Sequence, residues 1–444
     1  MRIAITAAEA SGDRVAGQLA RELRRLAPEV EIYGSGGTWL RDAGAEVLVD
    51  ANAFGVIGIA AALKLFPQML SARHRLLTEL KKRPPDVLIP IDARAFHLGI
   101  GPIQGLVPWA RRHLPQTKIL YYFPPGSWHK TLKYTPLSGL VDAVASPFPW
   151  NASELNRLGV RAEFVGHPLL DLVKPSLPLA VFAQKYGLDT DKPLVGLLPG
   201  SRTQEIEAIL PVQLAAALQI AQRIPGVQFL IALAPTVARA QVEAAIIEAT
   251  RHPEVIKEQP KPSSDTRQRR VVLAEGSADA LRQRQREWSE HAQPHRSDRL
   301  VIPPFAIVED ATYDVLSAAD ALICKSGTTT LEAAILGKPM VIVYKLGRGN
   351  ALQLALVRKS LPRFVGMPNI IAGEEICREL LQEAATPEAI ASEILGMLLD
   401  PDRMARMRRD LAQVRSQLGE PGGAERTAKL ALSLVGARSS VELD

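Results

Sequence analysis

The feature that most constrains the fold is a recurring pattern: a short apolar run, a turn rich in glycine and hydroxyl residues, and then a helical period. The clearest copy spans residues 318–345. Its apolar runs at 321–324 and 340–344 flank a Lys-Ser-Gly break at 325–327 and a helical period over 329–336. Such alternation is typical of α/β domains built on a parallel sheet.

The turn in this copy is a candidate ligand site. Loops at the carboxyl ends of parallel strands present unpaired backbone N–H groups, here joined by the hydroxyls of Ser326, Thr328 and Thr329. This arrangement suits an anion or a sugar hydroxyl. Glu332 has two interpretations: its carboxylate accepts from both hydroxyls of a ribose, or it closes a capping box with Thr329.

The same pattern runs through both halves of the chain. Apolar runs predict strands at 2–6, 31–34, 47–49, 87–91, 119–122, 143–145, 194–198 and 227–233. Ser11 or Asp13 is the expected N-cap of the first helix. In the second half, Arg202 begins a helix, where the macrodipole disfavours a cation. A bound phosphate would reverse that cost, so phosphate contact is favoured over a solvated arginine.

Composition excludes several classes of protein. A chain of 444 residues is long enough for two domains, and a net charge of +6 is too small for a dedicated nucleic-acid binder. Two cysteines make a disulfide framework improbable and indicate a reducing compartment. No Cys/His cluster has metal-ligand spacing, and no signal peptide or membrane-spanning window is evident. We expect a cytoplasmic protein that binds no metal and no nucleic acid.

Two segments differ from the α/β pattern. Residues 54–70 are too apolar for a solvent-facing helix and form either a buried helix or a surface for acyl chains or a membrane. Residues 251–299 are rich in Gln, Arg, Ser and Glu, which predicts an exposed and partly disordered insertion.

These boundaries give a predicted domain plan. An N-terminal Rossmann-like domain covers 1–170, and a proline-rich linker covers 171–193. A second Rossmann-like domain covers 194–375, and a helical tail at 376–444 packs back toward the first domain.

Several motifs recur together in one known family. The chain carries AAEASGD (7–13), GSGG (34–37), FGVIGI (54–59), EFVGHPL (163–169), LLPGSRTQEI (197–206), SGTTTLEAA (326–334) and MPNIIAG (367–373). In order and spacing it resembles the lipid-A-disaccharide synthase family of GT-B glycosyltransferases. The resemblance implies two Rossmann-like parallel-sheet domains with a cleft between them and a helical C-terminal tail.

The resemblance also implies a reaction and its residues. The reaction is an inverting, metal-independent transfer of 2,3-diacylglucosamine from UDP to the 6-hydroxyl of 2,3-diacylglucosamine 1-phosphate. The implied nucleotide-sugar contacts are Ser201, Arg202, Glu205, Ser326, Gly327, Thr328, Thr329, Glu332 and Asn369. The implied acceptor and acyl contacts are Ser11, Phe54, Val56, Ile57 and Trp128. The partners would be a UDP-linked acyl sugar, an acyl-sugar phosphate and the inner membrane surface, with a homodimer allowed.

The chain departs from the family on the acceptor side. An Asp-Ala-Pro-Asp-Phe-Asn pattern is replaced by residues 92–97, so Asp92 is kept and Ala95 takes the second acidic position. Residues 124–130 and Ala8 also differ from the family pattern. Asp92, Glu9 and His97 remain candidates for the base, although Asp92 could instead cap the following turn.

Three functions therefore remain open. The first is the glycosyltransferase, with the lipid A precursor or another acyl sugar as acceptor. The second is a non-hydrolysing UDP-sugar epimerase, against which the apolar segment at 54–70 argues. The third is a non-catalytic UDP-sugar-binding protein, which Ala95 permits.

Overall fold

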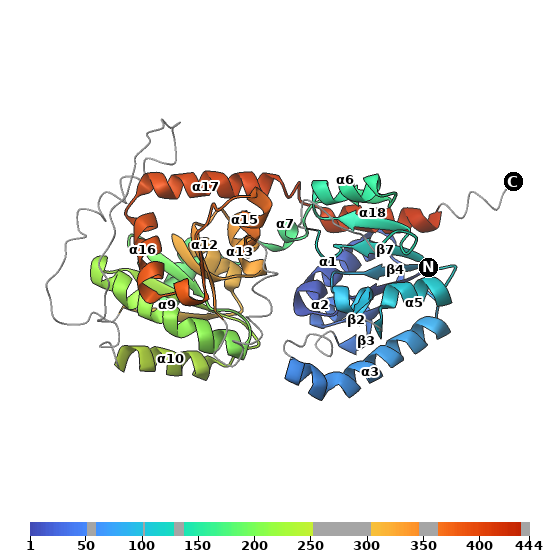
Figure 1. The fold of residues 1–444 in the computed structure, drawn as a ribbon, viewed down its shortest axis with the longest axis horizontal. Coiled ribbons are helices and arrows are strands. Elements are labelled where there is room, and N and C mark those ends of the chain that lie inside the picture. Colours follow the sequence, from blue (N-terminus) through green and yellow to red (C-terminus); the bar gives the residue numbers. More distant parts are fainter. Residues whose placement is uncertain (51–58, 101–102, 128–136, 252–302, 346–362, 437–444) are drawn as a thin grey trace. The chain divides into compact units, whose positions relative to one another are not determined.

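The computed structural model describes residues 1–444 except 51–58, 101–102, 128–136, 252–302, 346–362 and 437–444 (Figure 1). The chain divides into two compact units. Unit 1 comprises residues 1–172 and 416–444, and unit 2 comprises residues 173–415. Phe54, Val56, Ile57, Trp128 and nearly all of the predicted insertion lie outside the described residues.

Unit 1 is built on a parallel sheet with the strand order β3-β2-β1-β4-β7-β8-β9. Its strands are β1 (Arg2–Thr6), β2 (Glu31–Gly36), β3 (Glu46–Asp50), β4 (Val87–Pro90), β7 (Lys118–Tyr122), β8 (Ala143–Ser146) and β9 (Ala162–Phe164). A short antiparallel pair joins β5 (Gly99–Ile100) to β6 (Ile103–Gln104). The sequence predicted all of the parallel strands except β9.

Helices cover both faces of this sheet. They are α1 (Ala10–Leu26), α2 (Thr38–Asp42), α3 (Ile59–Lys82), α4 (Arg94–His97), α5 (Leu106–His113), α6 (Pro149–Arg157), α7 (Leu169–Leu172) and α18 (Gly423–Gly436). One buried cluster joins α1 and α18 to one face through residues such as Leu19 and Ala431. A second cluster joins α3, α5 and α6 to the other face through residues such as Leu80 and Leu155. Alternate strand residues supply each cluster, as strand geometry requires.

Unit 2 repeats this plan with the strand order β12-β11-β10-β13-β14-β15, again all parallel. Its strands are β10 (Leu194–Leu198), β11 (Gln228–Leu233), β12 (Phe305–Glu309), β13 (Ala321–Lys325), β14 (Met340–Tyr344) and β15 (Glu379–Leu381). Its helices are α8 (Leu179–Tyr186), α9 (Thr203–Arg223), α10 (Arg239–Arg251), α12 (Thr312–Ala318), α13 (Thr328–Ile335), α15 (Met367–Ala372), η5 (Gln382–Ala384), α16 (Pro387–Leu398) and α17 (Pro401–Ser416). The predicted class of two parallel-sheet α/β domains is confirmed.

Two parts of the predicted domain plan differ from the structure. Within the expected linker at 171–193, α8 packs on α12 and buries Phe182, so this segment belongs mainly to unit 2. The tail at 376–444 is divided: β15, α16 and nearly all of α17 lie in unit 2, and α18 packs on α1 of unit 1 (Figure 1). Proline spacing and helical period do not reveal which sheet a helix covers.

Candidate functional site

Most of the predicted site residues lie at the carboxyl edges of the two sheets. In unit 1 the strand order reverses between β1 and β4, and in unit 2 it reverses between β10 and β13. Ligands of open α/β sheets bind outside such switch points, where neighbouring loops diverge. Asp92 follows β4 and Glu9 follows β1, whereas Arg202 follows β10 and Ser326 follows β13.

Asp92 is held in an uncommon backbone conformation. Both Asp92 and Ala93 adopt left-handed φ angles of 48°, which non-glycine residues rarely do. The Asp92 carbonyl oxygen accepts from the Tyr121 hydroxyl at 2.7 Å and lies 2.7 Å from Nδ1 of His97. These two contacts fix the turn at the end of β4. Such strain is characteristic of functional sites.

The carboxyl group of Asp92 has a raised pKa. Burial, followed by the negative charge of Glu9, raises the pKa of Asp92 from 3.8 to about 6. A carboxyl group with a pKa slightly below pH 7 is mostly ionised at pH 7 and is still basic enough to take a proton. Both properties suit a general base. The geometry therefore supports Asp92 as the leading candidate among the three predicted bases.

His97 holds the backbone of Asp92 in place. The His97 side chain is fully buried, and its Nε2 lies 3.0 Å from the Thr6 hydroxyl. The carbonyl of Asp92 can only accept, so the proton is on Nδ1. Burial lowers the pKa of His97 to about 4, so the ring is neutral at pH 7 and Nε2 accepts from Thr6. With both nitrogens occupied, His97 positions Asp92, which contradicts its prediction as the base.

The loop after β1 presents two of the predicted residues to solvent. Glu9 is the N-cap residue of α1 but makes no side-chain cap bond, and Ser11 is exposed in the first turn. Asp13 does not cap α1. Its buried carboxylate accepts from the backbone N–H groups of Gly37, Trp39 and Leu40 at 2.6–3.1 Å and so holds the start of α2. The geometry of this loop thus depends on contacts across 24 to 27 residues.

In unit 2 the turn after β10 carries a group of paired charges. Glu205, in the first turn of α9, accepts from the backbone N–H of Ser201 at 3.0 Å and from Nη1 of Arg202 at 3.2 Å. Nζ of Lys325, at the end of β13, lies 2.8 Å from the same carboxylate. The structure thus brings together three predicted residues, Ser201, Arg202 and Glu205, and adds Lys325, for which the sequence pattern predicts only a turn.

The turn after β13 presents the start of α13. Gly327 is the N-cap residue with φ +153°, and Thr328 is exposed beside it. Ser326 is buried, and its hydroxyl donates to the carbonyl of Val365 at 2.8 Å. That bond uses the Ser326 hydroxyl proton within the protein. Gly327, Thr328 and Thr329 remain candidate contacts through the N–H groups at this helix start.

Glu332 is buried within α13 and accepts from the Tyr313 hydroxyl at 3.1 Å. Because α13 begins at Thr328, Thr329 is inside the helix and does not have the N-cap position that a capping box requires. The capping interpretation therefore does not fit. Contact with a ribose remains a prediction.

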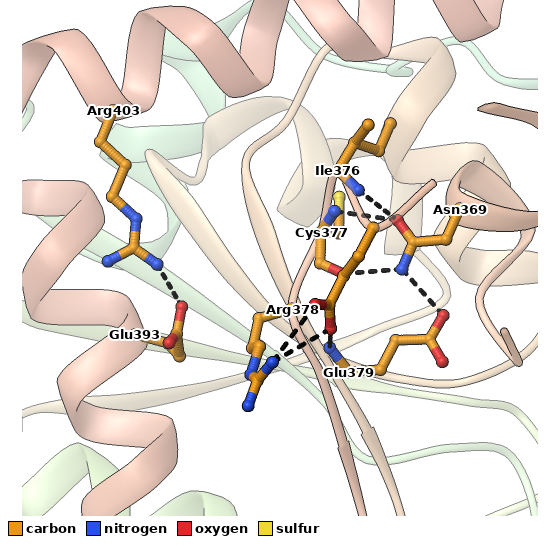
Figure 2. A network of polar contacts seen from close by, with 8 residues as sticks. Asn369, Ile376, Cys377, Arg378, Glu379, Glu393 and Arg403 are labelled. Atoms are coloured by element: carbon orange, nitrogen blue, oxygen red, sulfur yellow. Dashed lines mark hydrogen bonds and ion pairs between the residues drawn. The ribbon is translucent and has the colours of Figure 1, made fainter. Parts of the chain in front are cut away.

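Asn369 has a structural role. Its amide oxygen accepts from the N–H groups of Ile376 and Cys377, and its amide nitrogen donates to Cys377 O at 2.7 Å and to Glu379 at 2.8 Å (Figure 2). The side chain is fully buried. Glu379 in turn accepts from the N–H groups of Val365 and Gly366. This network contradicts direct nucleotide contact by Asn369 and fixes the loop that accepts from Ser326.

The described residues show no group of three or more His, Cys, Asp or Glu side chains that could hold a metal ion. Within the same residues, no helix is both long enough and apolar enough to span a bilayer.

Comparison with known proteins identifies the family. A family model described as lipid-A-disaccharide synthetase matches residues 3–261 and 303–434. The lipid-A-disaccharide synthase of Trichlorobacter lovleyi is 34% identical over 436 residues, covering 98% of this chain and 97% of that protein. The chain belongs to the lipid-A-disaccharide synthase family. Membership in this family spans both units, and the unmatched residues 262–302 overlap the predicted insertion.

Solved structures agree on the fold. A UDP-GlcNAc 2-epimerase from Neisseria meningitidis, at 11% identity, aligns with a TM-score of 0.52 over 98% of this chain and 100% of its own. The glycotransferase of kitacinnamycin aligns with a TM-score of 0.53 at 13% identity, over 98% of this chain and 99% of its own. Transferases and epimerases share this architecture, so the lipid-A-disaccharide synthase assignment rests on the sequence relatives.

Proposed function

We propose that this chain is an inverting glycosyltransferase that moves 2,3-diacylglucosamine from UDP to the 6-hydroxyl of 2,3-diacylglucosamine 1-phosphate. Family membership over both units supports the reaction class. The observation that carries the mechanism is the largely buried carboxyl group of Asp92, held at the switch point of unit 1 with a pKa of about 6.

In the proposed reaction, Asp92 accepts the proton of the acceptor 6-hydroxyl as that oxygen attacks the anomeric carbon of the donor sugar. The new bond joins O6 to C1. The bond from C1 to the diphosphate oxygen breaks, and its electron pair leaves with UDP. Attack from the opposite face inverts the anomeric configuration, so one base is sufficient. No metal or other cofactor enters this proposal.

The edge of unit 2 is proposed to bind the donor. The N–H groups at the starts of α9 and α13, together with Arg202, provide positive potential for the leaving diphosphate. Glu332 is proposed to accept from the ribose hydroxyls. His97 and Tyr121 act through Asp92, because both contact its backbone carbonyl and neither replaces its carboxylate.

The acceptor remains the less constrained substrate. Ala95 is exposed and takes the second acidic position of the family pattern, so any base function falls to Asp92 or to Glu9. Acylated substrates and the net charge of +6 are consistent with an enzyme that acts at an anionic membrane surface. We propose that this surface is the cytoplasmic face of the inner membrane.

The proposal is tested with the purified protein, UDP-2,3-diacylglucosamine and 2,3-diacylglucosamine 1-phosphate, with products followed by mass spectrometry. We expect an inverted disaccharide and one UDP released per bond formed. UDP released without a disaccharide would contradict the proposed acceptor. An altered sugar still linked to UDP would establish an epimerase, and binding without turnover would establish a binding protein.

A further inference from the structure

The carboxylate of Glu205 has more partners than a helix cap requires. One oxygen, Oε2, accepts from the backbone N–H of Ser201, as a glutamate in the first turn of a helix often does. The other oxygen, Oε1, contacts both Arg202 at 3.2 Å and Lys325 at 2.8 Å. The side chains of Glu205 and Lys325 are only 16% and 19% exposed. Capping explains the first contact and leaves the two cations unexplained.

The carboxylate also fills the glycine turn after β10. Gly200 has φ +123°, and a Cβ atom there would lie 2.3 Å from Oε2 of Glu205. On the next strand of the sheet, a Cβ atom at Gly327 would lie 3.5 Å from Nζ of Lys325. The ion pair therefore lies against two glycine turns and the two helix starts that follow them. Glycine turns of this kind allow an anion to approach the backbone closely.

The charges at this position do not balance. Arg202, Lys325 and the positive ends of two helices face one carboxylate, whereas a nucleoside diphosphate brings more negative charge and more acceptor oxygens. Thr236 further fixes the turn, because its hydroxyl donates to the carbonyl of Ser201. The donors are thus arranged for an anion larger than the carboxylate that they hold.

We propose that Glu205 occupies the anion site of unit 2 in the empty protein, that Lys325 is a direct ligand of the diphosphate, and that nucleotide binding displaces the carboxylate from both cations. This inference rests on the proposed function for the identity of the nucleotide. The anion site itself rests on the geometry of Gly200, Glu205 and Lys325.

Calorimetric titration of the full chain with UDP, inorganic pyrophosphate and uridine tests the proposal. Lys325→Met should weaken UDP and pyrophosphate binding by about tenfold or more, because charge-assisted hydrogen bonds are the strong ones. Glu205→Gln keeps an acceptor for the N–H of Ser201 and removes the competing charge, so it should strengthen both by about threefold to tenfold. Uridine binding should not change in either variant.

Two exposed pairs in unit 2 supply matched controls. Lys192→Met breaks the pair with Asp189, and Glu243→Gln breaks the pair with Arg239. Neither control should alter binding of UDP or pyrophosphate. Melting temperatures establish that each variant is folded, and Lys325→Met decides the ligand role even where Glu205→Gln is unstable.

Specific results would overturn the proposal. If Glu205→Gln weakened UDP binding or left it unchanged, the carboxylate would orient the cations and would not compete with the diphosphate. If Lys325→Met bound pyrophosphate like the unmodified chain, Lys325 would not be a ligand. A third outcome is that pyrophosphate binds with the expected dependence on Lys325 and Glu205 but UDP does not bind. That result would refute a nucleotide as the ligand and would retain the anion site.

Discussion

The two sheet edges have similar topology but shift the pKa of a partly buried carboxyl group in opposite directions. At the edge of unit 1, burial and the nearby charge of Glu9 raise the pKa of Asp92 to about 6. At the edge of unit 2, burial also raises the pKa of Glu205, but Lys325, the N–H of Ser201 and Arg202 together hold it below its usual value. The difference is the supply of counter-charge. One carboxyl is prepared to take a proton, and the other is kept as a fixed anion.

The largest expected effect is on Asp92. Asp92→Asn should reduce kcat by at least about a hundredfold, because the amide cannot accept the proton. The folded pKa is above that of the unfolded chain, so the ionised carboxylate costs stability once the pH rises from 3.8 through about 6. The variant should therefore be more stable at pH 7, by up to about 3 kcal/mol at 1.36 kcal/mol per pKa unit.

Rate measurements and thermal unfolding at pH 7 check both parts of this expectation. The exposed Asp42→Asn should change neither the rate nor the melting temperature. Unchanged turnover of Asp92→Asn would remove Asp92 as the base and leave Glu9.

Lowering the pH should destabilise unit 1 more than unit 2. Burial lowers the pKa of His97 to about 4 and of His167 to about 3. Stability from each neutral ring is present above pH 6.5 and is lost as the pH falls toward these values, by up to about 3 kcal/mol for His97 and about 5 kcal/mol for His167 on the same scale. Protonation of Asp92 offsets part of this loss. The described part of unit 2 contains no histidine.

Hydrogen exchange followed by mass spectrometry between about pH 7 and about pH 4 measures this difference. We expect the β1 and β4 peptides of unit 1 to lose protection before the β10 and β13 peptides of unit 2. Equal loss in the two units, or earlier loss in unit 2, would contradict the assignment of neutral buried histidines.

The hydrogen bonds that fix the loops at the two sheet edges also differ. Tyr121 and His97 hold one turn in unit 1, whereas Asn369 and Glu379 hold a whole loop in unit 2 (Figure 2). Asn369→Ala should destabilise unit 2 by about 3 kcal/mol, because several buried groups lose their partners. Arg378→Ala, in an exposed pair beside the same network, should cost less than about 1 kcal/mol. Similar unfolding midpoints for the two variants would contradict the structural role of Asn369.

The smallest expected effect is on the pH profile. If Asp92 must be ionised, kcat/KM should fall below about pH 6. Glu9→Gln removes the charge that contributes to the raised pKa, so the acidic limb should move to lower pH by less than about one unit. Glu29→Gln, at an exposed site in the same unit, is the control. A limb that did not move would show that burial alone sets the pKa of Asp92.

The sequence predicted the sheets better than the contacts at their edges. Buried parallel strands are continuous apolar runs, so 194–198 and 340–344 were identified at their observed boundaries. The role of Asp13 depends on amides of α2, and that of His97 depends on Thr6, 91 residues away. Lys325 becomes informative only when β10 and β13 are seen to be neighbours. Short-range patterns contain no signal for such pairs.

The placement of α18 has a consequence for how the protein is made. Ala428 and Ala431 complete the same core as Leu19 and Leu23 of α1, although more than 400 residues separate the two ends of the chain. On the ribosome, the first unit to be synthesised is therefore the last to be finished. Until its final helix emerges, the part of the sheet face over β4 and β7 remains an apolar surface that α1 alone does not cover, which is when protection by a chaperone would matter most.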